Sequence, residues 1–167
     1  MKKVVKFGGS SLASAEQFKK VGDIIRADKS RRYVVPSAPG KRSSSDTKVT
    51  DMLYSCYNLA IREKKFTSLL DEIHARYNEI IDGLNLELSL DHEFDMIREN
   101  FGKKIGRDYA ASRGEYLNGI IMANYLGFCF IDAAEVIRFH EDGSLDDEKT
   151  NELLSLRLEG EEFAVIP

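Results

Sequence analysis

The chain has 167 residues, of which 43% are hydrophobic and 31% are charged, and its formal net charge is −4. This length and composition fit one folded globular domain and argue against a disordered chain. Acidic and basic residues are interspersed, which disfavours a surface for nucleic acid. No apolar stretch near the N-terminus approaches the roughly 20 residues of a membrane span, so we expect no membrane partner and a cytoplasmic location.

The residues that most often bind metals are scattered along the chain. Cys56 and Cys129 lie far apart among apolar neighbours, which is the usual setting of reduced core thiols. His74, His92 and His140 have no cysteine or second histidine at ligand spacing. The sequence therefore predicts no metal site held by this chain alone.

The first elements alternate between strand and helix. Residues 2 to 7 (KKVVKF) are expected to form a strand. A helix should follow, because Ser14 and Gln17 form a capping box and apolar residues then recur at helical spacing. Residues 32 to 36 (RYVVP) indicate a second strand, which leads into a polar loop from residue 37 to 48.

The middle of the chain is predicted to be helical. From residue 49 to about 106, apolar positions fall three or four residues apart, with breaks expected near 82–83 and 88–91. Another helix should pass through Tyr116 and Leu117 and end at Gly127. These helices are expected to pack as a layer.

Strand and helix alternate again towards the end of the chain. Residues 128 to 132 (FCFID) predict a short buried strand, residues 146 to 158 a helix, and residues 162 to 167 (EFAVIP) a last strand. Such alternation favours an α/β fold with a mostly parallel sheet and helices on both faces.

Two glycines follow the first strand directly, in the segment KFGGSS (residues 6 to 11). Gly8 and Gly9 let backbone N–H groups converge on an anion, because no Cβ blocks the approach. The helix start near Ser14 would add partial positive charge and Lys6 a full charge, which together suit phosphoryl transfer. A tight turn with a solvated lysine is the alternative. The segment is neither a Walker sequence nor a G-x-G-x-x-G fingerprint.

A second loop is expected beside the first. The segment VVPSAPG (residues 34 to 40) ends a neighbouring parallel strand in Ser37 and Gly40, and the ends of parallel strands meet at one edge of a sheet. An ordinary surface loop is the alternative. In KVTDML (residues 48 to 53), Thr50 or Asp51 should cap the next helix, which leaves the other without a capping role.

The segment SRGEYLNG (residues 112 to 119) contains a glycine where a helix is expected. Ser112 and Glu115 fit a capping box, so Glu115 could simply close a helix end. Gly114 costs about 1 kcal/mol of helix propensity relative to alanine, which suggests a close approach to the backbone there. A carboxylate near the glycine loops would suit the ammonium group of a substrate.

In this order and spacing, the four segments resemble the N-terminal part of aspartokinases, in the amino-acid kinase family, over essentially the whole chain. The resemblance implies an αβα sandwich in which residues 1–167 form the amino-acid-binding N-terminal lobe. It implies transfer of the γ-phosphoryl of ATP, bound with Mg²⁺, to the side-chain carboxylate of L-aspartate. The product would be 4-phospho-L-aspartate, and its formation would be the first step in the synthesis of lysine, threonine and methionine. A homo-oligomer is expected for the full-length protein.

The resemblance also implies roles for seven residues. Lys6 would neutralise charge on the transferring phosphoryl, and the phosphate-contacting loop would consist of Gly8, Gly9 and Ser10. Ser37 and Thr50 match hydroxyl residues of the aspartate and phosphate pocket, and Glu115 matches the glutamate that holds the amino acid. No general base is required, because a carboxylate is already ionised at neutral pH.

The chain departs from the family pattern in three places. Pro36 stands where a hydrogen-bonding residue usually precedes the serine, and it removes a backbone donor beside Ser37. The loop from residue 41 to 48 is longer than in many relatives. An S-R-G-G-S-D segment, a nucleotide-binding lobe and ACT domains would lie beyond Pro167, so we expect a fragment that cannot catalyse alone.

Two alternatives stay open. One is another amino-acid kinase, acting on glutamate or on a nucleotide monophosphate, although such enzymes are not expected to show both KVTD and RGE in this register. The other is a non-catalytic α/β module, in which the glycine loops are only turns and the helices of residues 49 to 106 form a surface for a partner.

Overall fold

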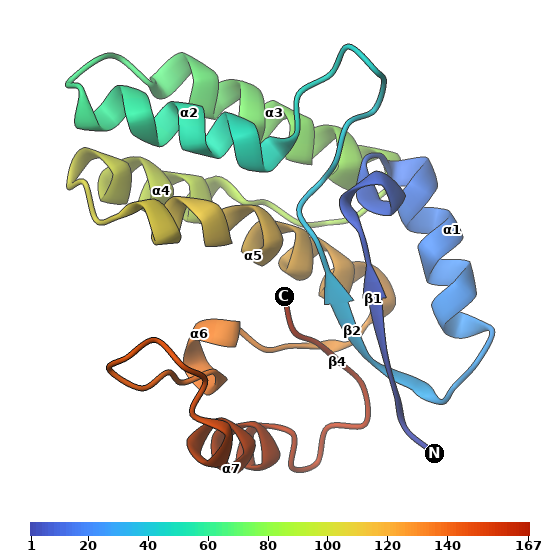
Figure 1. Ribbon diagram of the computed structural model, residues 1–167. Helices are drawn as coiled ribbons and strands as arrows, with labels where there is room; N and C mark the ends of the chain where they lie inside the picture. The colour runs from blue at the N-terminus through green and yellow to red at the C-terminus, as the bar shows by residue number, and fades with distance from the viewer.

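The computed structural model describes residues 1–167, which fold around a parallel four-stranded sheet (Figure 1). The strands are β1 (Lys3–Phe7), β2 (Arg31–Pro36), β3 (Cys129–Phe130) and β4 (Ala164–Val165). Their order across the sheet is β1-β2-β4-β3, and all three pairings are parallel. Strands stand at all four predicted positions, and the expected α/β fold is confirmed.

One short 3₁₀ helix and seven α-helices connect and cover the strands. They are η1 (Gly9–Leu12), α1 (Ala15–Arg26), α2 (Val49–Ile61), α3 (Thr67–Gly83), α4 (Asp91–Gly102), α5 (Arg107–Leu126), α6 (Ala133–Val136) and α7 (Asp147–Arg157). The predicted start of α1 is confirmed, since the Ser14 hydroxyl accepts a hydrogen bond from the Gln17 backbone N–H at 3.4 Å. None of the helices has both the length and the apolar character needed to cross a bilayer.

Two predicted helix caps are wrong. Helix α5 begins at Arg107, so Ser112 and Glu115 lie inside it, and the Ser112 hydroxyl donates instead to the Tyr109 carbonyl at 2.9 Å. Helix α2 begins at Val49 and has no side-chain cap, so neither Thr50 nor Asp51 is used in capping. Both Thr50 and Glu115 are therefore free of the structural roles that offered an alternative explanation for them.

Alternation along the central strands separates two cores. Val34 and Val165 face the larger core, which contains α1 to α5. Tyr33 and Ala164 face a smaller core on the opposite side of the sheet, which α6 and α7 cover. Since successive side chains of a strand point to opposite faces, this pattern produces the helix layers on both sides.

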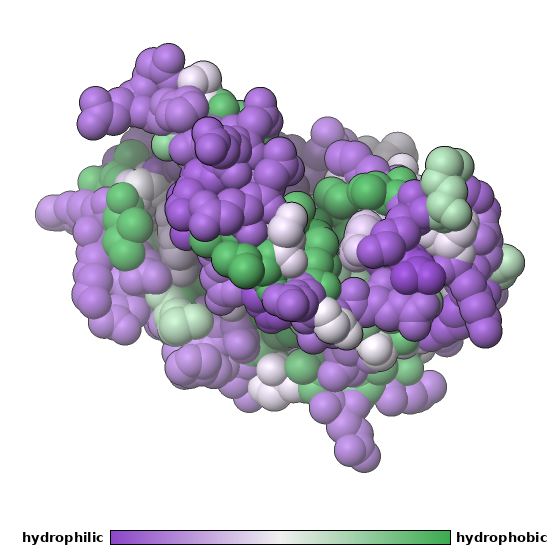
Figure 2. Space-filling model, turned by 90° about the horizontal axis from the view of Figure 1, so that it is seen from below, coloured by the Kyte–Doolittle hydropathy of each residue, from purple (hydrophilic) through white to green (hydrophobic).

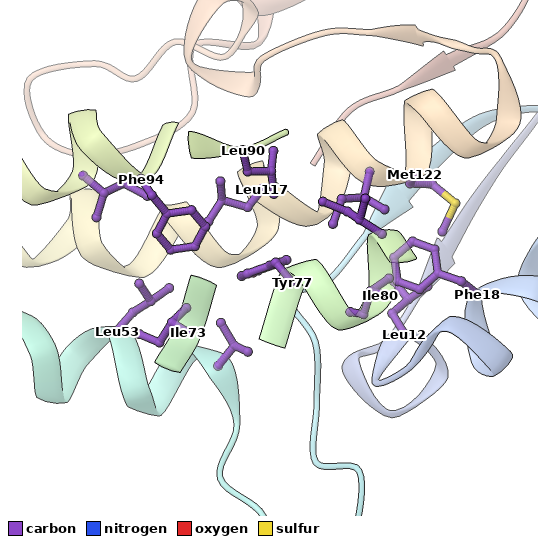
Figure 3. Packing of buried hydrophobic residues seen from close by; sticks show 14 of the residues in the cluster. Leu12, Phe18, Leu53, Ile73, Tyr77, Ile80, Leu90, Phe94, Leu117 and Met122 are labelled. Carbon is purple, nitrogen blue, oxygen red and sulfur yellow. The ribbon is translucent and has the colours of Figure 1, made fainter. Parts of the chain in front are cut away.

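Helix α5 lies between the sheet and the layer formed by α2, α3 and α4 (Figure 1). Its buried residues occupy more than one face, as expected for a helix that packs against both the sheet and other helices. Figure 3 shows Leu117 and Met122 of α5 among buried side chains from the other helices, including Tyr77. Seen from the end that carries α7, the surface is mostly hydrophilic, with smaller hydrophobic areas between (Figure 2).

Candidate functional site

A cleft of about 460 Å³ opens where the chain leaves β1 and β2. It is lined by Gly9 and Ser10 after β1, by residues 37 to 41 after β2, by Lys48 and Thr50 at the start of α2, and by Glu115 of α5. The predicted loops therefore meet at one edge of the sheet, and five of the seven predicted site residues line a single cleft.

The two loops contact each other through glycine backbone. The N–H of Gly40 donates to the carbonyl of Gly9 at 2.8 Å. A Cβ on Gly40 would lie only 2.6 Å from the carbonyl carbon of Gly9, and a Cβ on Gly9 would lie 2.8 Å from the carbonyl oxygen of Ala38. Glycine at both positions lets the loops approach this closely.

Lys6 reaches the cleft through Ser37. Val5 and Phe7 of β1 pack against the larger core, so Lys6 extends from the other face of the strand. Its ammonium group donates to the Ser37 hydroxyl at 3.3 Å. Lys6 is exposed and does not itself line the cleft, but it contacts a side chain that does.

Ser37 is well placed despite the proline before it. Pro36 pairs with Phe7 across the β1–β2 ladder, and the Ser37 N–H donates to the Phe7 carbonyl at 3.0 Å. In this parallel register the bond to Phe7 is made by Ser37, so the N–H that Pro36 lacks is not one that the β1–β2 ladder uses. Gly8, like Lys6, does not line the cleft; it is exposed, and its carbonyl accepts from the N–H of Ser11.

Thr50 and Glu115 are half-buried and face the cleft from the helical layer. Gly114, next to Glu115, allows α5 to lie against the second loop, since a Cβ there would be 2.7 Å from the Ala38 methyl. The close approach predicted from this glycine is confirmed. Thr50 lies on the same side, with its hydroxyl oxygen 3.8 Å from that Cβ position.

Charges around the cleft have a simple arrangement. Lys41 and Lys48 are exposed cations at its rim, and Glu115 is the one acidic residue that lines it. Lys6, Lys41 and Lys48 offer positive charge for phosphate groups, and Glu115 offers one carboxylate for an ammonium group. No group of three or more His, Cys, Asp or Glu side chains lies in a position to hold a metal ion.

Three buried residues that support the cleft had no predicted role. The side-chain amide of Asn118 donates to the Ser37 carbonyl at 2.7 Å, and the Tyr77 hydroxyl donates to the Gly114 carbonyl at 2.8 Å. Burial raises the pKa of Tyr77 well above its usual range, and the nearby Glu115 adds to this shift, so the phenol keeps its proton. Arg76 binds the loop after β2.

The fold has clear relatives among solved structures. Aspartate kinase from Clostridium acetobutylicum is 46% identical and superimposes with a TM-score of 0.95, covering 100% of this chain and 39% of that one. E. coli aspartokinase III, solved in complex with aspartate and ADP, is 20% identical with a TM-score of 0.73, covers 99% of this chain and 40% of that one, and supports the fold alone.

Curated relatives carry related names. Aspartokinase 3 of Bacillus subtilis is 46% identical over 88 residues, which is 53% of this chain and 19% of that protein. Aspartokinase 1, chloroplastic, of Arabidopsis thaliana is 31% identical over 158 residues, which is 89% of this chain and 27% of that protein. The chain thus spans less than a third of the length of either relative. Residues 1–167 match the amino acid kinase family, and the chain belongs to that family.

Proposed function

We propose that this chain is the amino-acid-binding lobe of an aspartate kinase. The full-length protein would transfer the γ-phosphoryl of MgATP to the side-chain carboxylate of L-aspartate and release 4-phospho-L-aspartate and ADP. This is the reaction that begins lysine, threonine and methionine synthesis. One observation carries the proposal: Gly9, Ser10, Ser37, Thr50 and Glu115 line a single cleft, and Lys6 binds Ser37 at its edge.

The cleft suits a reaction that depends on charge and position. A carboxylate oxygen of aspartate attacks the γ-phosphorus, and the bond from that phosphorus to the oxygen bridging to ADP breaks. The nucleophile is already ionised at neutral pH, so no base has to remove a proton. Negative charge spreads over the moving phosphoryl oxygens, which the Lys6 ammonium and the loop N–H groups of Gly9 and Ser10 would stabilise.

Glu115 would select the amino acid. Its carboxylate can accept charge-assisted hydrogen bonds from the ammonium group of aspartate, while the Thr50 and Ser37 hydroxyls face the same cleft. Mg²⁺ would arrive with ATP as part of the substrate. Within residues 1–167 we therefore assign it no ligands, and we propose that the nucleotide lobe and the regulatory ACT domains lie in the rest of the full-length protein.

The proposal is tested by assaying the purified full-length protein for ADP release and for acyl phosphate trapped as the hydroxamate. We expect product with L-aspartate and none with L-glutamate or nucleoside monophosphates. Turnover with glutamate instead would identify another amino-acid kinase. Absence of any ATP turnover and of any aspartate binding would favour the interaction module. The isolated chain of 167 residues should be inactive in the same assay.

Location and assembly are also proposed for the full-length protein. A cytoplasmic, homo-oligomeric enzyme follows from the family resemblance. Size-exclusion chromatography with light scattering, together with cell fractionation, tests both points.

A further inference from the structure

Arg76 is an almost completely buried arginine on α3, with 3% of its surface exposed. Its guanidinium group donates to the carbonyl oxygens of Gly40 and Thr47 and lies 3.1 Å from a carboxylate oxygen of Asp46. These partners stand at both ends of the loop from residue 41 to 47. A single side chain therefore connects the two ends of this loop to the helical layer.

Packing of the apolar core alone does not explain a charged side chain at this position. Burying a guanidinium group is unfavourable unless carbonyl and carboxylate groups compensate it, and the carbonyl and carboxylate groups that contact this one belong to Gly40, Asp46 and Thr47. Arginine presents several N–H donors in one rigid plane, so it can hold separate carbonyls at a fixed distance. A lysine ammonium has the charge but not this planar arrangement.

The loop that Arg76 holds belongs to the cleft. Gly40 bonds to Gly9 of the first loop, and Thr47 leads directly into Lys48 and Thr50. A shift of either end would move the wall that faces the substrate. The next residue of α3, Tyr77, donates to the Gly114 carbonyl beside Glu115; Figure 3 shows its side chain in the core beneath α5.

We propose that Arg76 is a positioning residue for the phosphoryl-transfer site: by clamping Gly40 and Thr47 it keeps the second loop against the first and places Lys48 and Thr50. This inference rests on the proposed function. It gives α3 a role in the site, whereas the alternative, in which the helical layer binds a partner, assigns no such role to α3. Asp46 supports the clamp from within the loop, because it also binds Arg42 at 3.0 Å.

The experiment compares Arg76→Met, Arg76→Lys and, as a control, Arg62→Met in the full-length protein, by steady-state kinetics and by hydrogen exchange of residues 41–48. Arg76→Met should lower kcat/KM about 100-fold, the scale expected for a misplaced site, and should speed exchange of the loop amides. Arg76→Lys should retain most of the thermal stability but remain at least about tenfold impaired, since one ammonium cannot hold both carbonyls. Arg62→Met replaces an exposed arginine at the C-terminal end of α2, the end away from Lys48, and should leave both readouts unchanged.

Wild-type kcat/KM in Arg76→Lys and Arg76→Met, measured well below their melting temperatures, would overturn the inference. The inference would also be overturned if the loss of kcat/KM in these variants disappeared on cooling in step with refolding, because such a loss reflects stability alone. If Arg76→Met does not fold, Arg76→Lys decides. The two proposals fail separately. If the wild-type protein does not phosphorylate aspartate, the proposed function is wrong. If the loop amides of Arg76→Lys exchange at the wild-type rate, the clamp is wrong.

Discussion

The side-chain amide of Asn118 donates a 2.7 Å hydrogen bond to the backbone carbonyl of Ser37. Asn118 follows Glu115 by three residues on α5, so the two side chains lie on neighbouring positions of one helix face. This bond ties α5 to the end of β2. It therefore helps to set the separation between the carboxylate of Glu115 and the Lys6–Ser37 pair.

Replacing Asn118 with alanine should loosen this connection. Asn118 is fully buried, and the variant leaves the Ser37 carbonyl without its side-chain donor, which typically costs about 1 to 3 kcal/mol of unfolding free energy. Urea unfolding measures this cost, and aspartate KM in the full-length protein should rise. Asn124→Ala, at an exposed position of the same helix, should change the unfolding free energy by less than about 0.5 kcal/mol. Equal behaviour of the two variants would contradict the role of the bond.

Lys6→Ala in the full-length protein should reduce kcat by about 10²- to 10³-fold, because it removes a positive charge from the proposed site of phosphoryl transfer. Lys3→Ala provides a control on the same strand, since Lys3 pairs with Asp28 at the other end of β1. Its kcat should equal that of the wild type. Steady-state kinetics at saturating aspartate and ATP distinguish the two, and an unchanged kcat in Lys6→Ala would defeat the assignment.

Glu115→Gln should act mainly on substrate affinity. The carboxamide keeps the size of the side chain but loses the charge that would bind an ammonium group, and hydrogen bonds to charged groups contribute about 1.5 to 3 kcal/mol. Aspartate KM should therefore rise by about 10- to 150-fold, with a smaller change in ATP KM. Glu87→Gln, at an exposed position between α3 and α4, serves as the control. If aspartate KM stays the same in Glu115→Gln, this residue does not bind the amino acid.

Gly114→Ala should destabilise the fold even though alanine favours helices by about 1 kcal/mol. The new methyl would lie 2.7 Å from the Ala38 methyl, and overpacking of this kind costs about 1 to 3 kcal/mol. Adding Ala38→Gly should recover the loss, which a double-mutant cycle by urea unfolding can measure. Gly102→Ala, where no atom lies within 4 Å, should instead stabilise by about 0.5 kcal/mol. Lack of recovery in the double variant would show that the contact is not the cause.

Cys56 should make the protein sensitive to alkali. Burial raises the pKa of its thiol to about 12, above the value near 8.5 of an unfolded cysteine. The unfolded chain therefore loses the proton first, and the stability that the neutral thiol contributes is present below about pH 8.5 and lost as the pH rises towards 12. Urea unfolding between pH 7 and 11 should show a steeper decline for the wild type than for Cys56→Ala. Parallel declines would argue against the raised pKa.

Much of the fold and part of the candidate site could be predicted from the sequence, because the patterns that indicate them lie within short segments. The strand segments, the cap of α1 and the KFGGSS loop are readable from neighbouring residues. The predicted cap at Ser112 is wrong for the same reason: the local pattern is that of a helix start, but α5 already begins at Arg107. Helix α6 has only four residues, too few to produce a helical period.

The supporting residues could not be predicted from local patterns. Arg76, Tyr77 and Asn118 look like ordinary members of helix faces. Their partners lie 29 to 81 residues away along the chain, so their roles emerge only when the helices pack against the loops. The signal that a sequence offers for such residues is weak: a charged or amide side chain at a position where the helical period requires an apolar one.

The strand order also has a consequence for the growing polypeptide. Val34 of β2 pairs with Val165 of β4, so the second edge of β2 has no partner until Val165 has left the ribosome. At about 5 to 20 residues per second, this interval lasts on the order of ten seconds. Helices α2 to α5 are complete before this, once Leu126 has been added. The nascent chain therefore has to keep an unfinished parallel sheet from pairing with other molecules while its helical layer is already able to form.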